Sequence, residues 1–150
     1  MAQSVGFLLY RAFAVQLKAA AETAAAVFVE NPALPIDMKG KGERVLFVLR
    51  RGDRLVDQPG VQPERRIGRV IVGAVALTKA GPEDADALHF AARDLLKSLA
   101  FRGVLKEAGG THDLREIELE PELREVVTEG SMLMSAYEFE YMQTYPSFAL

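Results

Sequence analysis

The sequence predicts an α+β fold: a mixed, mainly antiparallel sheet of about four to five strands with two helices packed on one face. Three observations favour this class. Apolar runs of strand length outnumber helical repeats, only two helical segments separate them, and 150 residues suit one domain. A parallel βαβ series would instead place a helix after nearly every strand. We therefore expect residues 1–150 to form a single domain.

The first helix is expected over residues 4–23. Ser4 is a suitable N-cap, and apolar residues recur at helical spacing from Val5 to Leu17. The alanine-rich stretch 19–26 has high helix propensity, so it should continue the helix until the chain turns into the sheet.

Two short segments then begin the sheet. Residues 25–29 are expected to form a short strand, which Asn31-Pro32 and Pro35 interrupt because proline restricts the residue before it. Residues 45–51 are a nearly continuous run of β-forming apolar residues and predict a buried strand.

An irregular, charged segment precedes the most apolar strand. Residues 53–66 contain two prolines, Gly60 and several charged residues without a period, which predicts a loop that is either functional or disordered. Residues 67–78 follow as a strand with two apolar faces. Such a strand is either central and covered on both sides within its own chain, or covered by another subunit.

The second helix is expected from Pro82 to Arg102. Pro82 suits the first turn, the acidic residues after it complement the helix dipole, and Gly103 is a natural C-terminal stop. Its apolar stripe recurs at helical spacing and comprises Leu88, Ala92, Leu95, Leu96 and Leu99.

Two strands are expected to complete the sheet. Residues 114–119 alternate in polarity until Pro121 ends them, and residues 133–145 form a longer, half-buried antiparallel strand. The inner face of this last strand is expected to be an aromatic row, formed by Leu133, Tyr137, Phe139, Tyr141 and Tyr145.

Composition limits the compartment and the class of partner. The chain has no cysteine, which excludes disulfides and thiolate metal sites. Its N-terminal apolar run lacks a preceding positive charge and is interrupted by Arg11 and Lys18, so we expect neither a secretory signal nor a membrane span, and a protein made and used in a cytoplasm. A net charge of only −3 predicts no nucleic-acid and no membrane partner.

The charges are segregated along the chain. Residues 39–69 hold nine basic and four acidic side chains, a net charge of +5, whereas residues 107–141 hold ten acidic and two basic ones, a net charge of −8. These segments are either separate solvated faces or complementary surfaces of neighbouring copies.

The residue pattern specifies no reaction, cofactor or metal site. His89 and His112 belong to no metal-binding or triad motif, and each is expected to be structural. Glu116, Glu118 and Glu120 alternate, so we expect them to share one exposed strand face rather than to perform acid–base chemistry. We therefore predict no catalytic, cofactor-binding or metal-binding residues, and a protein that is not an enzyme.

Three features favour assembly into an oligomer: the charged loop 53–66, the two-faced strand 67–78 and the segregated charge. Each is expected where copies pack head to tail, because a heterologous contact joins two different surfaces of one chain and gives a ring when the rotation closes. Each also has a simpler explanation: a disordered loop, a strand covered by its own helices, and solvated charge.

The layout of the whole chain combines an N-terminal helix, a break at Asn31-Pro32 and Pro35, a strand pair flanking a charged loop, a helix that begins at Pro82, and a closing strand within 129–146. This layout resembles that of the tail terminator and tail-completion (minor tail) proteins of long-tailed bacteriophages. The resemblance covers nearly the whole chain, and no short diagnostic motif carries it.

The resemblance implies a structural, homo-oligomeric ring, commonly a hexamer, that caps the tail tube, stops its growth and joins tail to head. The implied partners are other tail or connector proteins, and the implied location is the virion tail and, during assembly, the host cytoplasm. Loop 53–66 and its flanking arginines would then lie at a subunit interface or face the tube. With the acidic row, the candidate interface residues are Arg50, Arg51, Arg54, Arg65, Arg66, Glu116, Glu118 and Glu120.

Two other functions remain open. A tail tube protein or another minor tail protein would form open stacks rather than one closed ring. A small-molecule-binding or enzymatic α+β domain would use a pocket beside Tyr137, Phe139 and Tyr141, although a sheet that faces two helices needs such a row for its core.

Overall fold

A computed structural model describes residues 2–56, 60, 62–126 and 129–146, and it confirms the α+β fold. The sheet has the strand order β1-β2-β3-β5-β4; β1 pairs parallel with β2, and the other described pairs are antiparallel. The elements are α1 (Val5–Thr23), β1 (Val27–Glu30), β2 (Arg44–Leu55), β3 (Glu64–Ala76), α2 (Gly81–Leu96), α3 (Leu99–Ala108), β4 (Arg115–Ile117), α4 (Pro121–Arg124) and β5 (Ser131–Gln143).

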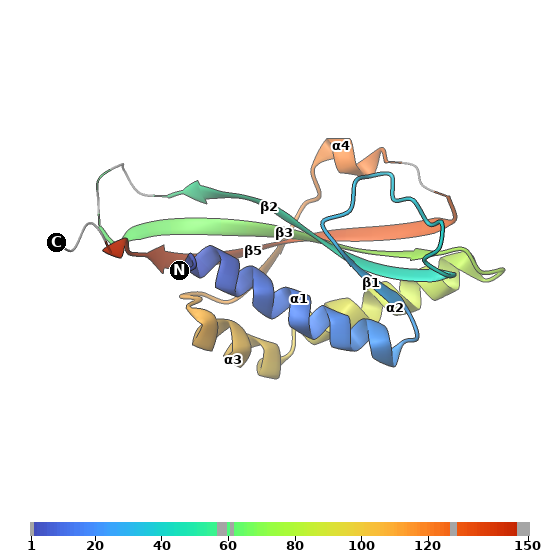
Figure 1. Ribbon diagram of the computed structural model, residues 1–150, viewed down its shortest axis with the longest axis horizontal. Helices are drawn as coiled ribbons and strands as arrows, with labels where there is room; N and C mark the ends of the chain where they lie inside the picture. Colours follow the sequence, from blue (N-terminus) through green and yellow to red (C-terminus); the bar gives the residue numbers. More distant parts are fainter. Residues whose placement is uncertain (1, 57–59, 61, 127–128, 147–150) are drawn as a thin grey trace.

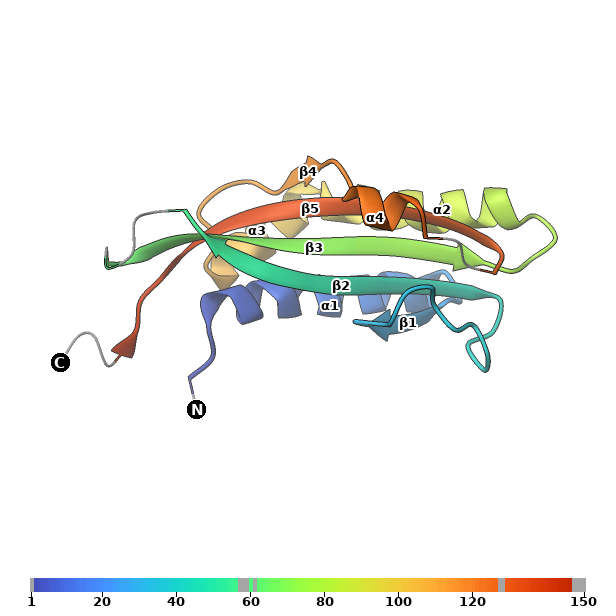
Figure 2. The ribbon, with the colours of Figure 1, turned by 90° about the horizontal axis from the view of Figure 1, so that it is seen from above.

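Different parts of the chain cover the two faces of the sheet (Figure 1). The helices α1, α2 and α3 lie against one face, which we call the helical face. Residues 31–43 and the short helix α4 lie over the second face, and Figure 2 shows both of them over the same half of the sheet. Among the described residues, the other half of the second face carries no covering element.

The central position predicted for strand 67–78 is confirmed by β3. Val70, Val72 and Ala74 point into the core under the helices, while Ile71 and Val75 pack with the cover on the second face. All five side chains are 0% exposed. Both covers come from the same chain, so this strand needs no second subunit to bury it.

The predicted second helix is interrupted at Ser98. The Ser98 hydroxyl donates to the carbonyl of Leu95 at 2.7 Å and accepts from the amide of Phe101 at 3.1 Å, so it ends α2 and caps α3. The change of direction turns Phe101 into the core and leaves Leu99 77% exposed. Assigning Leu99 to the buried stripe was therefore wrong.

The helix end predicted at Gly103 was also wrong. Gly103 lies inside α3, and the helix ends instead at Gly109, which has φ of 116°. This left-handed conformation suits glycine, because a side chain there would be strained. A second glycine six residues downstream gives the same sequence signal, so propensity alone did not distinguish the two positions.

The predicted loop 53–66 is strand at both of its ends. β2 continues to Leu55 and β3 begins at Glu64, with Arg54 opposite Ile67 and an irregularity in register between Arg51 and Arg54. Charged side chains on these strands hide the apolar alternation by which a strand is usually recognised. Residues 57–59 and 61 of the predicted loop lie outside the described residues.

The other predicted elements are confirmed with small changes of boundary. Ser4 caps α1 by accepting from the amide of Phe7 at 3.1 Å. The short strand of 25–29 is β1, and the strand of 45–51 lies within β2. Of the strand predicted over 114–119, β4 retains the first part, because the chain leaves the sheet to enter α4.

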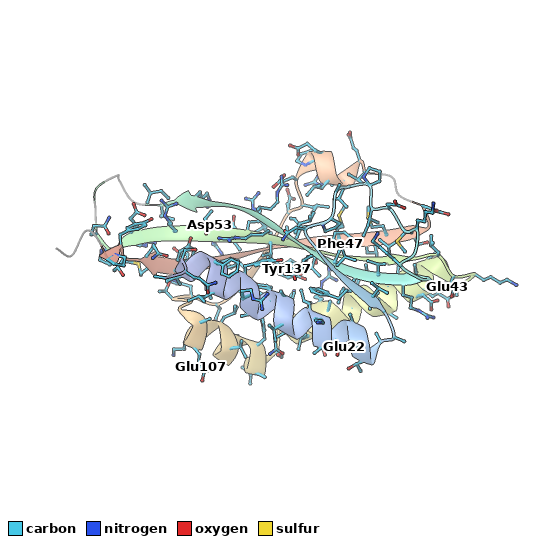
Figure 3. The ribbon with its side chains drawn as sticks, in the orientation of Figure 1. Glu22, Glu43, Phe47, Asp53, Glu107 and Tyr137 are labelled. Atoms are coloured by element: carbon cyan, nitrogen blue, oxygen red, sulfur yellow. The ribbon has the colours of Figure 1, made fainter. Side chains whose placement is uncertain are left out.

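The aromatic row of β5 belongs to the core under the helices. Tyr137, Phe139 and Tyr141 are each at most 2% exposed, and the Phe139 ring lies 5.5 Å from that of Phe13 in α1. Figure 3 shows Tyr137 between the sheet and the helices. The two ends of the predicted row differ, since Leu133 is 39% and Tyr145 42% exposed.

Close packing on the second face depends on Gly73. Phe47, labelled in Figure 3, lies opposite Gly73 in the β2–β3 register. A Cβ atom built on Gly73 would lie 2.1 Å from Phe47 Cζ, which is far shorter than any van der Waals contact. The glycine therefore provides the space in which the phenyl ring lies across the centre of the sheet.

We expect Gly73→Ala to lower the free energy of unfolding by about 1–3 kcal/mol, because the added methyl group overpacks this site. Gly103→Ala is the matched control, since a Cβ there meets nothing within 4 Å. Because Gly103 lies in the interior of α3, Gly103→Ala should raise the free energy of unfolding by about 0.5–1 kcal/mol. Urea unfolding measures both changes, and a Gly73→Ala protein as stable as the wild type would contradict the packing argument.

Candidate functional site

The candidate interface residues are divided between the two faces of the sheet. Arg50 lies on the helical face, where its guanidinium carbon is 5.7 Å from the ring centroid of Phe7 and 5.9 Å from that of Tyr10. Arg51, which is opposite Arg69 in the β2–β3 register, lies on the second face with Glu120. The predicted set is therefore not one surface.

Three of the candidate residues come together on the uncovered half of the second face. Arg51, Arg54 and Glu120 lie with residues of β3, β4 and β5 that are not among the predicted interface residues. The resulting group is called the arginine cluster and consists of Arg51, Arg54, Arg69, Arg115, Glu120 and Glu138.

Arg69 is the centre of the arginine cluster. Its guanidinium donates to Glu120 at 3.0 Å and to Glu138 at 3.2 Å. Arg51 also donates to Glu120, at 2.8 Å, and Arg115 to Glu138, at 3.0 Å. Burial alone would raise the pKa of Glu120, but the hydrogen bonds from Arg51 and Arg69 outweigh it, so this pKa lies below its usual value.

Every member of the arginine cluster except Arg115 lines a concavity of about 350 Å³. Glu138 is its most enclosed acid, with a side chain 9% exposed, and Arg54 reaches it only at 4.0 Å. The side chains of Arg54 and Arg115 are 60% and 62% exposed. The carboxylates thus lie deep in the concavity, the guanidinium group of Arg54 lies at its rim, and Arg115 lies beside it, joined to Glu138.

The remaining charged candidates pair elsewhere in the chain. Glu116, Glu118 and Glu120 do not share one strand face, because β4 ends at Ile117. The pairs are Arg65 with Glu140 at 3.1 Å, Arg66 with Glu64 at 2.9 Å, Glu116 with Arg93 at 3.2 Å and Lys97 at 3.0 Å, and Glu118 with Arg124 at 3.4 Å. Of these pairs, only Arg65 with Glu140 joins the basic middle of the sequence to its acidic end, as Arg51, Arg54 and Arg69 of the arginine cluster also do.

Asp53 joins the irregular part of β2 to the helical face. Tyr141 donates a short hydrogen bond to Asp53 Oδ2, and Arg50 lies 3.5 Å from the same oxygen. Burial and the hydrogen bond to Asp53 raise the pKa of Tyr141 above its usual range. Gly6 of α1 packs directly against this pair, since a Cβ there would be 2.2 Å from Asp53 Oδ2. The arrangement fixes α1 to the sheet.

His89 forms a buried hydrogen-bonded chain with β5. Its Nε2 is 2.9 Å from Ser135 Oγ, and Ser135 donates to the hydroxyl of Tyr137 at 2.8 Å. A serine next to a histidine is the arrangement of many nucleophiles. Here His89 is 4% and Ser135 5% exposed, and the serine proton is directed at Tyr137. These hydrogen bonds therefore join α2 to β5 inside the core, which fits the structural role expected for His89.

A second and larger cavity lies between α3 and the chain that leads into β4. Its volume is about 650 Å³, within the range of small-molecule sites. Leu96, Leu105 and Leu114 supply its apolar lining, and Lys106 and Arg102 are among its cations. His112, the other histidine, is exposed at its edge. The aromatic row of β5 lines neither of the two cavities described here.

Comparisons with known proteins assign no family. No family model matches the chain, and no curated protein matches its sequence. Within the described part of the chain, no group of three or more histidine, aspartate or glutamate side chains could hold a metal ion. In the same residues, no helix has the length and hydropathy needed to cross a membrane.

The buried histidine gives a prediction for pH dependence. Burial first, and the nearby charge of Arg93 second, lower the pKa of His89 below 6.5 in the folded chain. The unfolded chain therefore binds this proton more readily, so the contribution of His89 to stability is present above about pH 6.5 and lost as the pH falls towards the folded pKa.

We expect the free energy of unfolding of the wild type to fall more steeply below about pH 6.5 than that of His89→Gln. Glutamine retains a hydrogen-bonding group opposite Ser135 but does not titrate. Urea unfolding at a series of pH values from neutral to mildly acidic compares the two proteins. If the two stability curves ran parallel, the pKa of His89 would be the same in the folded and the unfolded chain, and the prediction would be wrong.

Proposed function

We propose that the chain is a structural subunit that assembles head to tail into a closed homo-oligomeric ring, of the kind that ends a phage tail and joins it to the head. The observation that carries this proposal is a pair of open edges on opposite sides of the sheet. The layout of elements, which resembles that of tail terminator proteins, supports it further.

The first open edge belongs to β2. Its partner β1 ends with Glu30 opposite Val48, so residues 51–55 have no strand partner on that side in the described chain. This edge continues into an arm, defined as residues 54–56 and 64–66, that extends past the start of α1 (Figure 1). Val56 on the arm is 37% exposed.

The second open edge belongs to β5. β4 pairs only with Tyr137 and its immediate neighbours, and an isolated bridge joins Gly110 to Tyr141. Residues 131–135 therefore have no strand partner on the outer side among the described residues. Leu133, within this edge, is 39% exposed.

Open edges of this kind favour pairing between chains. Unpaired amide and carbonyl groups along a strand form a template for a further strand. Because the two edges differ and lie on opposite sides of one sheet, the edge of one copy can meet the other edge of the next copy. Such a heterologous contact closes into a ring when its rotation allows.

The charged side chains favour assembly less strongly than the open strand edges do. Arg51 and Arg65 already have carboxylate partners within the chain, so these charges do not require a neighbouring copy. The proposed contact therefore rests on strand edges and on the apolar side chains beside them, with charge in a secondary role.

We expect light scattering after size-exclusion chromatography to give one discrete oligomeric mass, and electron microscopy of the same sample to show closed rings. Open stacks would instead identify a tube-forming protein. A strict monomer at all protein concentrations and salt concentrations would contradict the proposal.

Val56→Asp and Leu133→Asp should each lower the oligomeric mass, because each places a charge beside one of the two open edges. Leu99→Asp in α3 is the matched control: it removes an exposed apolar side chain and adds the same charge away from both edges. If only Leu99→Asp dissociates the oligomer, the contact lies on the helical layer and the edge argument is wrong.

The larger cavity favours a second candidate function, the binding of a small molecule with an apolar body and an anionic end. Its leucines would contact the body, and Lys106, which has no charged partner among the described residues, would meet the anion. Octanoate should then raise the melting temperature of the wild type and not of Lys106→Glu. An equal rise in both proteins would argue against this site.

A further inference from the structure

The uncovered half of the second face contains an excess of positive charge that the described residues do not neutralise. The arginine cluster has four guanidinium groups and two carboxylates. The neighbouring Arg65 and Glu140 form a pair of opposite charges and do not change this balance. The cluster therefore carries a net charge of +2, and all of its members except Arg115 line a concavity of about 350 Å³.

The arrangement of the cluster places the excess charge where a ligand would enter. Arg69, Arg115 and Arg54 converge on the carboxylate of Glu138, at 3.2, 3.0 and 4.0 Å. One carboxylate cannot neutralise three guanidinium groups, so the cations repel one another. An added anion at the rim would relieve this repulsion.

The rim also retains hydrogen-bond donors. Each guanidinium presents five N–H donors. Among the described residues, Arg54 has only the 4.0 Å contact to Glu138, and Arg115 only its 3.0 Å bond to the same residue. Both side chains are more than half exposed. Planar guanidinium groups bind carboxylate and phosphate oxygens through paired hydrogen bonds, which an ammonium group does not match.

We propose that the arginine cluster is a binding site for a small oxyanion with two or more negative charges, of the phosphate or polycarboxylate class. Arg54 and Arg115 bind the oxyanion directly, together with Arg51. Arg69 is a positioning residue, because its donors hold Glu120 and Glu138. The small volume and the two carboxylates at the base disfavour a long polyanion such as nucleic acid.

This proposal does not depend on the ring. The oxyanion is either free in solution or a carboxylate from a neighbouring copy, and the chemistry at the rim is the same in both cases. The two sources differ in one measurable respect: a free phosphate ion would compete with a neighbour's carboxylate and lower the oligomeric mass.

The test measures the melting temperature of the full chain with inorganic phosphate or citrate, at an ionic strength held constant with sodium chloride. We expect a saturable rise in the wild type. The Arg54→Gln/Arg115→Gln protein should need about tenfold more phosphate to reach the same rise in melting temperature, because it loses charge-assisted hydrogen bonds. Arg11→Gln/Lys18→Gln removes the same charge from the exposed side of α1 and should respond as the wild type does.

Two results would overturn the proposal: no rise beyond that in chloride, or an equal rise in the Arg54→Gln/Arg115→Gln protein. If that variant fails to fold, Arg54→Gln alone is used, since it loses only the 4.0 Å contact. Light scattering with and without phosphate then identifies the source. A lower mass in phosphate indicates a neighbour's carboxylate, and an unchanged mass indicates a free anion.

Discussion

Burial of β3 on both faces organises the rest of this molecule. A strand with apolar side chains on both sides needs two covers, and the chain supplies them from different segments. The helices α1, α2 and α3 form the first cover, and residues 31–43 with α4 form the second. The second cover is shorter than the sheet, and the uncovered part of that face is where β3 changes from apolar residues to Arg69.

The same constraint explains where the charges lie. On the uncovered half of the second face, side chains must tolerate water on one side and a tightly packed sheet on the other. Arg69 and Glu138 are opposite each other in the β3–β5 register, so arginine and glutamate extend their apolar stems over the sheet and pair at their ends. Segments separated by about seventy residues thereby neutralise much of each other's charge.

The functional proposals use the two parts of the sheet that the chain leaves incomplete. The open edges of β2 and β5 offer backbone groups to another strand, which favours a head-to-tail ring. The open half of the second face offers guanidinium groups to an anion. Both lie on the sheet, and neither involves the buried chain from His89 to Tyr137, which stabilises the core.

Much of the fold followed from the sequence, because it depends on local patterns. Ser4, the apolar periodicity of α1 and the two-faced run of β3 predicted their elements correctly. The boundary at Ser98 also had a local signal, an N-cap residue, but the continuous leucine spacing across it favoured one long helix. Strand extension through Arg54 and Glu64 was missed because charged residues there replace the apolar alternation.

The candidate site was only partly predictable. The segregation of charge along the sequence predicted Arg51, Arg54 and Glu120 as interface residues. It did not predict Arg69, Arg115 and Glu138, since nothing in their local sequence relates them to one another. Their proximity is decided by strand order and register, in which β3 separates β2 from β5. The sequence by itself determined most of the segments that form strands and helices, because these depend on local patterns, and which charges exist. Only the tertiary structure decided which charges meet, because pairing across a sheet depends on contacts between residues far apart in the chain.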